Sequence, residues 1–432
     1  MSIVVSDYKN ICQLLEEEER IIVFGAGTFG KKLLAEIEQI CGNLDKVVAI
    51  VDNEASKQGD LINGLEICAV DKIRNIYKKC IIIIAMKAYE SVLRQVDNMP
   101  QFNGWKCCVY HIMNEGWCYS TVEELKYHKR INEKVITQYA MNIQHMNERE
   151  KVQLLDHKRQ ELRAGKHIIA KMVFIATNRC TLKCEGCLGR VPYFNDPKDI
   201  DINIILRDID LFLQCIDECI AIEIAGGEPL LYPHLDVLLD YLIKSEKVLG
   251  VRLTTNGTVV PNETTLGYMA HEKVKVGISD YGMLDRLAQG VYSFEKHGVN
   301  FVFHSNMTWT DPGDLSKRNR SKEELKEQFE NCWDAFNCKT IVNGRLFACA
   351  RYARLYMQDI HNFEKDSISL LEYENLEERR NAIFDLYMVD YANSCDYCNF
   401  GTKDCKTIPA GLQMSTSFYR SAYTLVKRKV DA

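Results

Sequence analysis

Residues 172–187 read MVFIATNRCTLKCEGC, and this stretch decides the fold. It opens with an apolar run of strand length, and three cysteines follow at the spacing Cys-x3-Cys-x2-Cys: Cys180, Cys184 and Cys187. Three thiolates so close in sequence can converge on one ion or cluster, and they leave one coordination position open. Structural zinc takes four ligands, whereas soft thiolates also suit iron–sulfur clusters. The spacing therefore indicates a reactive metal centre after a strand, with a zinc site or chance clustering as the alternatives.

The order of apolar run and polar motif repeats further along the chain. We expect strands at 221–225, 250–254, 274–279 and 300–303, with helices between most of them, as at 204–215 and 235–244. The first three of these strands end in the motifs GGEP, TNGT and SDYG. Strands that alternate with helices imply a parallel sheet, and the carboxyl ends of its strands form the face where barrel active sites lie. The sequence therefore predicts an α/β fold with a central partial TIM-like (β/α)6 barrel.

Together and in this order, the four motifs resemble the signature of the radical S-adenosylmethionine (radical SAM) superfamily. The resemblance implies that Cys180, Cys184 and Cys187 hold a four-iron, four-sulfur (4Fe-4S) cluster, whose fourth iron binds S-adenosylmethionine (SAM). It also implies one-electron cleavage of SAM to methionine and a 5′-deoxyadenosyl radical, which removes a hydrogen atom from a substrate. A small electron donor of the flavodoxin or ferredoxin type is the implied protein partner.

The same resemblance assigns residues that would contact SAM. It implies that the cofactor's amino group meets three residues of the second motif: Gly226, Gly227 and Glu228. Asn256 and Ser279 are the candidates for its ribose or carboxylate. One position departs from the pattern, because many members carry an aromatic residue before the third cysteine and this chain has Gly186. We expect weaker packing against the adenine there, with cluster binding unaffected.

Six further cysteines lie near the C-terminus: Cys332, Cys338, Cys349, Cys395, Cys398 and Cys405. Their spacing resembles the auxiliary-cluster extension called SPASM, in its shorter single-cluster form called Twitch. This resemblance implies one auxiliary 4Fe-4S cluster held by Cys349, Cys395 and Cys398, with either Cys332 or Cys338 as the fourth ligand. A structural zinc ribbon is the alternative that these spacings also allow. The nine remaining cysteines are scattered between Cys12 and Cys219, and we expect small buried hydrophobic residues there.

The N-terminal region contains a second glycine motif. An apolar run at 21–24 leads into Gly25, Gly27 and Gly30, and after a helix at 31–40 a strand at 47–51 ends at Asp52. This is the order of a dinucleotide-binding βαβ unit, in which the glycines permit a tight turn, a close approach to phosphate and close helix packing. A further strand is expected at 81–85, and the pattern ends near residue 115. The size is that of half a two-nucleotide fold, and it resembles the small Rossmann-like modules beside sugar-modifying enzymes. We expect this module either to bind a nucleotide or nucleotide-sugar or to serve only in packing.

Composition limits the partners and the number of domains. The 432 residues include 54 Lys and Arg and 60 Asp and Glu, which gives a net charge of −6. A mildly acidic chain favours neither nucleic acid nor anionic membrane. Without an export signal or a membrane-spanning run, we expect a cytoplasmic protein with reduced thiols. We divide it into a Rossmann-like module (1–115), a helical linker (116–166), a radical SAM core (167–315), an auxiliary-cluster domain (316–410) and a tail (411–432).

The sequence thus predicts a radical SAM enzyme with one auxiliary cluster. Because of the N-terminal module, oxidation or epimerisation of a sugar, a nucleotide-sugar or another small or carrier-linked metabolite is the first expectation. A peptide-modifying enzyme of the same superfamily is the second, although no winged-helix peptide-binding domain is evident. The alternative from another class is a zinc-stabilised, nucleotide-binding scaffold.

Overall fold

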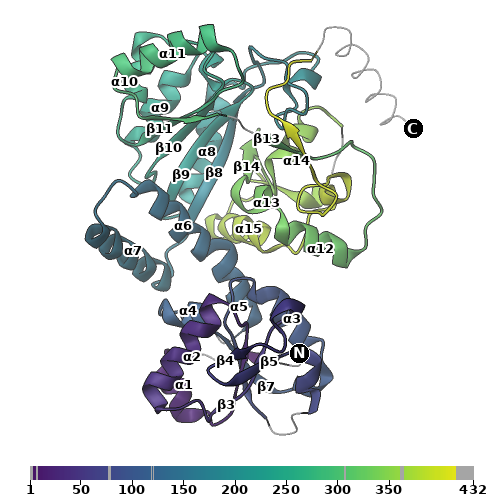
Figure 1. The fold of residues 1–432 in the computed structure, drawn as a ribbon. Helices are drawn as coiled ribbons and strands as arrows, with labels where there is room; N and C mark the ends of the chain where they lie inside the picture. The colour runs from purple at the N-terminus through teal and green to yellow at the C-terminus, as the bar shows by residue number, and fades with distance from the viewer. Residues whose placement is uncertain are drawn as a thin grey trace. The chain divides into compact units, whose positions relative to one another are not determined.

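The computed structural model describes residues 3–5, 8–75, 79–117, 119, 121–305, 308–360 and 364–414 (Figure 1). The chain divides into two compact units, one ending at Lys129 and the other beginning at Arg130. This division falls inside the segment predicted as a helical linker, where the structure has helices α5 (Val122–Tyr127), α6 (Glu133–Asn142) and α7 (Glu148–Arg163). Each unit has its own predominantly parallel sheet.

The sheet of the N-terminal unit has seven strands in the order β1-β7-β6-β2-β3-β5-β4. The strands are β1 (Ile3–Val5), β2 (Ile21–Phe24), β3 (Val47–Val51), β4 (Leu61–Ile62), β5 (Leu65–Cys68), β6 (Ile81–Ile84) and β7 (Trp105–Val109). All neighbours pair in parallel except β4 and β5. Besides α5, the unit contains helices α1 (Ile11–Glu17), α2 (Thr28–Cys41), α3 (Tyr89–Asp97) and α4 (Tyr110–Asn114). Figure 1 shows α1 and α2 on one side of the sheet and α3 on the other.

Three strands of this unit were predicted from their apolar runs, and the structure has them as β2, β3 and β6. The sequence missed the other four strands. β4 is two residues long, and β7 carries the exposed Lys106 inside an otherwise buried run, so neither has the clean apolar pattern of β2. The sheet therefore contains more parallel strands than the half-sized fold expected from the glycine motif.

The second unit has an eight-stranded sheet in the order β12-β11-β10-β9-β8-β14-β15-β16. The strands are β8 (Ile168–Thr177), β9 (Glu218–Gly226), β10 (Val251–Thr255), β11 (Val274–Ser279), β12 (Phe301–His304), β14 (Thr340–Val342), β15 (Arg345–Phe347) and β16 (Ser367–Ser369). Strands β8 to β12 pair in parallel in chain order, as in a TIM-like fold. Among the described residues the sheet does not close on itself, which confirms the predicted partial barrel.

The helices of this unit connect successive strands and cover the sheet. They are α8 (Ile202–Gln214), α9 (Leu235–Lys244), α10 (Glu263–Met269) and α11 (Leu284–Lys296), followed by α12 (Lys322–Asn331), α13 (Trp333–Asn337), α14 (Ala350–Tyr356) and α15 (Leu376–Met388). The predicted helices at 204–215 and 235–244 correspond to α8 and α9. Within the described part of the chain, none of the helices has the length and apolar character needed to cross a membrane.

The cysteine-rich segment is continuous with the core sheet. Its strand β14 pairs in parallel with β8, with Thr340 opposite Val173 and Ile341 opposite Phe174, and β15 and β16 continue the sheet in antiparallel fashion. A separate two-stranded sheet joins β13 (Thr308–Asp311) to β17 (Lys406–Pro409). A sixth parallel strand thus comes from the region expected to form the auxiliary domain.

Most of the scattered cysteines have the burial expected of small hydrophobic residues. Five are buried: Cys80, Cys107, Cys108, Cys215 and Cys219. Two are half-buried, Cys41 and Cys68, and Cys12 is exposed. The ninth, Cys118, lies outside the described residues.

Candidate active site

Cys180, Cys184 and Cys187 lie in the loop that follows β8. Cys184 is buried, and the other two thiols are half-buried. The loop is held at its start by Asp199, which accepts hydrogen bonds from Thr177 Oγ1 at 2.6 Å and from Arg179 Nε at 3.0 Å. Burial raises the pKa of Cys180 to about 12 and that of Cys184 to about 11. The loop therefore keeps these thiols largely out of water at the carboxyl end of a central strand.

Gly226 and Gly227 bring the end of β9 against this loop. A Cβ atom on Gly226 would lie 2.8 Å from the Thr177 carbonyl oxygen, and one on Gly227 would lie 2.3 Å from the Arg179 oxygen and 3.0 Å from the Cys180 Cβ. Any side chain at either position would collide with the backbone that leads into the first cysteine. The close approach explains both glycines, and their predicted contact with the amino group of SAM stays a prediction.

Glu228 joins the ends of β9 and β10. Its carboxylate is fully buried and accepts hydrogen bonds from Thr255 Oγ1 at 2.7 Å, from the Asn256 backbone N–H at 2.8 Å and from the Leu230 N–H at 3.1 Å. Burial raises the pKa of Glu228 to about 7, and these three donors oppose the rise. Both carboxylate oxygens are engaged within the protein, so Glu228 orients the Asn256 loop. Its contact with the cofactor remains a prediction.

Asn256 is buried beside the first cysteine. Its Nδ2 lies 3.5 Å from the Cys180 sulfur and donates to Thr181 Oγ1 at 3.1 Å. Hydrogen bonds to ligand sulfurs are one of the means by which proteins set cluster potentials. Ser279 is buried at the end of β11 and hydrogen-bonds Tyr281. Both candidate SAM contacts thus lie at the carboxyl ends of strands next to the cysteine loop.

Residues 411–414 pair with the cysteine loop, although the sequence predicted a tail that begins at residue 411. The Glu185 N–H donates to the Leu412 oxygen at 2.7 Å, the Met414 N–H donates to the Lys183 oxygen at 2.8 Å, and Gln413 Nε2 lies 3.1 Å from the Cys184 sulfur. Residues 415–432 of the predicted tail lie outside the described residues. No periodic pattern marks so short a strand-like contact, so the sequence could not indicate it.

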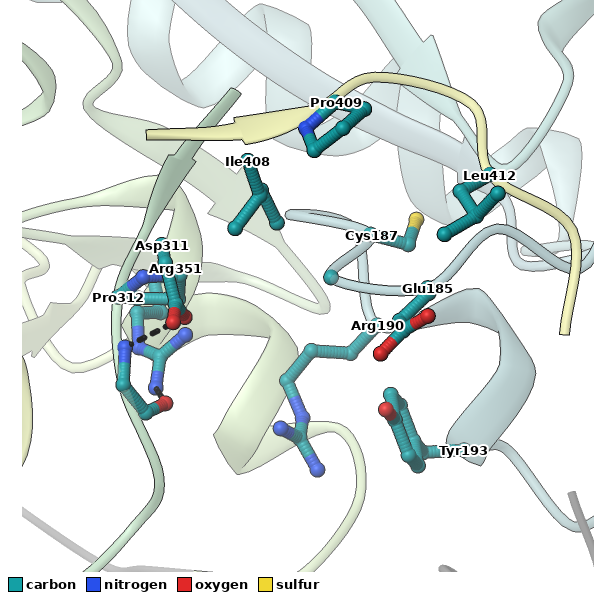
Figure 2. Close-up of a pocket in the computed structure, with 12 residues that line it drawn as sticks. Glu185, Cys187, Arg190, Tyr193, Asp311, Pro312, Arg351, Ile408, Pro409 and Leu412 are labelled. Carbon is teal, nitrogen blue, oxygen red and sulfur yellow. Dashed lines mark hydrogen bonds between the residues drawn. The ribbon is translucent and has the colours of Figure 1, made fainter. Parts of the chain in front are cut away.

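The structure gives a physical reason for the glycine at position 186, which the sequence did not show. Its φ is +66°, and a Cβ atom there would lie 2.3 Å from Cδ1 of Ile408 in β17. Ile408 therefore lies where the side chain of an aromatic residue at 186 would begin, and Figure 2 shows it across from Cys187. The departure from the usual pattern is thus coupled to a strand far along the chain.

The second cysteine group assembles around one small cavity. Cys332, Cys349, Cys395 and Cys398 all line it, together with Phe329 and other residues of α12 to α14 and the turn before β17. Arg320 and Gln328 both donate to the carbonyl oxygens of Cys395 and Cys398, which fixes that turn. Four cysteines that line one cavity are the number of thiolate ligands that a 4Fe-4S cluster takes.

Cys338 and Cys405 lie away from this cavity. The Cys338 sulfur is 3.9 Å from Lys171 Nζ, which forms an ion pair with Glu223 at 2.8 Å. The Cys405 sulfur donates to the Asp311 carbonyl oxygen at 3.4 Å. Cys332 and Cys338 are the two candidates for the fourth auxiliary ligand, and of these only Cys332 lines the cavity. Nowhere in the described ranges do three His, Cys, Asp or Glu side chains lie close enough together to hold a single metal ion.

The N-terminal glycine turn is also tightly packed. Gly25 has φ +111°, and a Cβ on Gly30 would lie 1.9 Å from the Gly25 oxygen, so α2 packs directly on the turn. A Cβ on Gly27 would meet nothing within 4 Å. Asp52 is buried and accepts hydrogen bonds from the Ala26 and Glu54 N–H groups at 2.8 and 2.9 Å, with Lys57 Nζ at 3.6 Å. Asp52 is therefore engaged with the turn itself.

Comparison with known families identifies the core. Residues 174–294 match the radical SAM superfamily, and these include all three cysteines of the first group. The core of this chain is a radical SAM domain. The family uses a 4Fe-4S cluster and SAM, and the three thiols at the end of β8 are the donors that such a cluster requires. For this site, the match favours the iron–sulfur enzyme over the zinc-stabilised scaffold. Residues 17–102 match the family described as C2185-like, N-terminal.

Curated relatives match this chain over only part of their length. The GTP 3',8-cyclase of Campylobacter jejuni subsp. doylei is 27% identical over 131 residues, which are 27% of this chain and 40% of the cyclase. The GTP 3',8-cyclase of Nautilia profundicola is 38% identical over 84 residues, or 19% of this chain and 26% of the cyclase. This chain therefore spans less than half the length of these relatives.

Two solved structures are also similar. The structure described as anSMEcpe with bound AdoMet and Cp18Cys peptide is 14% identical, with a TM-score of 0.34, and the match covers 60% of this chain and 99% of that one. The structure of BtrN in complex with AdoMet and 2-DOIA is 15% identical, with a TM-score of 0.32, and covers 53% and 92% respectively.

Proposed function

We propose that the chain cleaves SAM reductively and uses the resulting radical to oxidise or epimerise a sugar, a nucleotide-sugar or another small metabolite. The observation that carries this proposal is the loop of Cys180, Cys184 and Cys187, against which the ends of β9 and β10 are tied through Gly227 and Glu228. When bound, the cluster and SAM supply the electron transfer and the 5′-deoxyadenosyl radical. The electron donor in this proposal is a flavodoxin or ferredoxin.

The chain's own residues position the cluster loop and tune its surroundings. Asn256 donates to the sulfur of Cys180, and Gln413 donates to that of Cys184. Arg354, which is buried, donates to Asn178 Oδ1 at 3.0 Å and to the Gly226 oxygen at 3.2 Å. Because Arg354 lies in α14, directly after Cys349, it links the auxiliary cysteines to the glycine motif of the core.

The auxiliary site is proposed to hold one 4Fe-4S cluster through Cys332, Cys349, Cys395 and Cys398. A buried amine accompanies these thiols: Lys339 donates to the Ala335 and Ala348 oxygens, and burial lowers its pKa while the cysteines raise it. In its protonated form this amine offsets part of the negative charge that four thiolates would bring to a cluster.

Formation of 5′-deoxyadenosine tests the proposed reaction. The full chain, reconstituted anaerobically with iron and sulfide, is expected to produce 5′-deoxyadenosine and methionine from SAM when dithionite or reduced flavodoxin is added, and none without a reductant. Liquid chromatography measures both products. A chain with a full iron content that leaves SAM intact under reducing conditions would refute the proposal.

For the N-terminal unit we propose binding of a nucleoside diphosphate or its sugar at the Gly25–Gly30 turn. Gly27 is the N-cap residue of α2, no side chain caps that helix, and the space beside Gly27 is open. Amides at a helix N-terminus favour phosphate. The proposal also rests on the βαβ order of the sequence around this turn.

Gly27→Val is the matching test. The open space beside Gly27 should allow the variant to fold, while the valine side chain should block the approach of phosphate. We expect at least a tenfold loss of UDP-glucose affinity in the full chain, measured by titration calorimetry, from the loss of one or two charge-assisted hydrogen bonds. Gly267→Val is the control, since Gly267 also has open space but lies in α10 of the other unit. If neither UDP nor UDP-glucose binds the parent chain, the turn serves only in packing.

A further inference from the structure

A cavity of about 310 Å³ lies between the cysteine loop and the C-terminal elements of the same unit (Figure 2). The loop side contributes Cys187, Arg190 and Tyr193, and the other side contributes Asp311, Arg351 and Ile408. Pockets for small molecules begin at about 300 Å³, so the cavity has room for a ligand of monosaccharide size. One of its walls carries a ligand residue of the proposed cluster.

Arg190 is buried in the wall of this cavity. Its side chain is 8% exposed, its Nε donates to Gln358 Oε1 at 2.8 Å, and the guanidinium lies 4.8 Å from the centre of the Tyr193 ring. Among the described residues, one terminal nitrogen, Nη2, has no hydrogen-bond partner. The backbone of Arg190 is left-handed, with φ +52°, a conformation that costs energy in a residue other than glycine.

Arg351 approaches the cavity from α14 and is 7% exposed. One of its nitrogens, Nη2, donates to the Gly313 oxygen at 3.4 Å, while Nε has no partner in the described part of the chain. Arg351 also lines the cavity of the auxiliary cysteines. It therefore stands between the two cysteine sites, with an unused donor.

Neither guanidinium group at the cavity has an ion-pair partner. In the described ranges the ion pairs of arginines in this unit involve others, such as Arg179, Arg318 and Arg345, and not Arg190 or Arg351. Asp334 interacts with Arg351 electrostatically but forms no ion pair with it. Two acids also line the cavity. Glu185 is exposed to solvent, and Asp311 accepts a hydrogen bond from the Gly313 N–H at 2.9 Å. Burying two like charges that form no ion pair is costly, and an anion in the cavity would offset that cost.

We propose that this cavity is the substrate pocket and that Arg190 and Arg351 hold an anionic group of the substrate, a carboxylate or a phosphate. The inference deepens the proposed function and rests on it. The planar guanidinium donates two parallel hydrogen bonds to either anion, which fixes orientation as well as position. With the anionic group anchored there, the rest of the substrate faces Cys187 and the side chain of Ile408 (Figure 2).

Titration calorimetry on the full, anaerobically reconstituted chain tests this pocket with two anions and one neutral control. The probes are inorganic phosphate, glucuronate and glucose at matched ionic strength. We expect the parent to bind at least one of the two anions and not glucose. Arg190→Gln and Arg351→Gln should each weaken anion binding at least tenfold, from the loss of charge-assisted hydrogen bonds. Arg345→Gln is the control, because Arg345 lies on β15 outside the pocket.

The anion that binds identifies the source of the negative charge. Binding of glucuronate alone indicates a carboxylate substrate, and binding of phosphate alone indicates a phosphorylated one. If either glutamine variant fails to fold, Arg190→Lys and Arg351→Lys keep the charge but lose the planar fork, and an affinity below that of the parent supports the proposal.

Three results would overturn the pocket assignment: no binding of either anion by the parent, variants that bind as the parent does, or variants that lose affinity for SAM but keep it for the anions. The last result would place the arginines at the cofactor carboxylate. Anion binding does not require SAM cleavage. A parent that binds an anion through these arginines but forms no 5′-deoxyadenosine therefore refutes only the proposed reaction.

Discussion

The two cysteine sites of this chain are built in different ways. Cys180, Cys184 and Cys187 come from one loop after β8. The four cysteines proposed for the auxiliary site come from three separate segments: the start of α13, the N-cap of α14 and the turn before β17. Three thiolates leave a coordination position for a reactant, while four close the shell. The comparison shows that candidate ligands within one loop can be recognised from their spacing in the sequence. Ligands that come from distant segments can be chosen only when the folded structure is known.

Loss of one ligand at the three-thiol site should have the largest effect. Cys184→Ala removes a third of the protein ligands, so we expect 5′-deoxyadenosine formation to fall to the level without enzyme. Cys12→Ala is the control, because Cys12 is exposed in the other unit, and it should react at the parent rate. Parent-rate cleavage of SAM by Cys184→Ala would disprove the assignment of this loop.

A matched pair of variants sharpens the four-thiol side of the comparison. Cys332 lines the auxiliary cavity and Cys338 does not, so Cys332→Ala should lose up to about four irons per chain and Cys338→Ala should keep the parent content. Iron analysis and electron paramagnetic resonance of the reduced proteins measure this difference. The opposite result, with iron lost only in Cys338→Ala, would place the fourth ligand outside the cavity.

The smallest expected effect is a shift in the potential of the first cluster. Gln413→Leu removes the N–H donor from the Cys184 sulfur, and donors to sulfur stabilise the more negative reduced state. A hydrogen bond worth about 1 kcal/mol corresponds to about 40 mV for one electron, so the potential should fall by roughly that amount. Redox titration measures it, with Gln95→Leu in the N-terminal unit as control. A rise in potential would contradict this role of Gln413.

The sequence predicted the parts of the molecule that depend on local patterns. Strands β8 and β9 have long apolar runs because most of their residues are buried in a parallel sheet, and the motifs at the strand ends follow from chain order. Strand β14 is only three residues long, so no periodicity could separate it from a loop. Nor could spacing choose between Cys332 and Cys338, since that choice depends on how α12 and α13 fold around the cavity.

Long-range contacts explain the other features that the sequence could not supply. The space beside Gly186 is taken by Ile408, more than two hundred positions along the chain, and Gln413 reaches Cys184 from a segment without any strand pattern. Arg190 and Arg351 carry no motif at all. Their proposed role depends on burial without an ion-pair partner, which is a property of the folded chain alone.

The measurement that tests the two-site account most directly is the metal content of the full chain after anaerobic reconstitution. The account predicts about eight irons per chain with an equal amount of sulfide, because each site holds four. The triple variant Cys349→Ala, Cys395→Ala, Cys398→Ala should retain about half of that iron and keep the first cluster. About four irons in both proteins, or one equivalent of zinc in the parent, would contradict the account by showing that the four-thiol cavity holds no cluster.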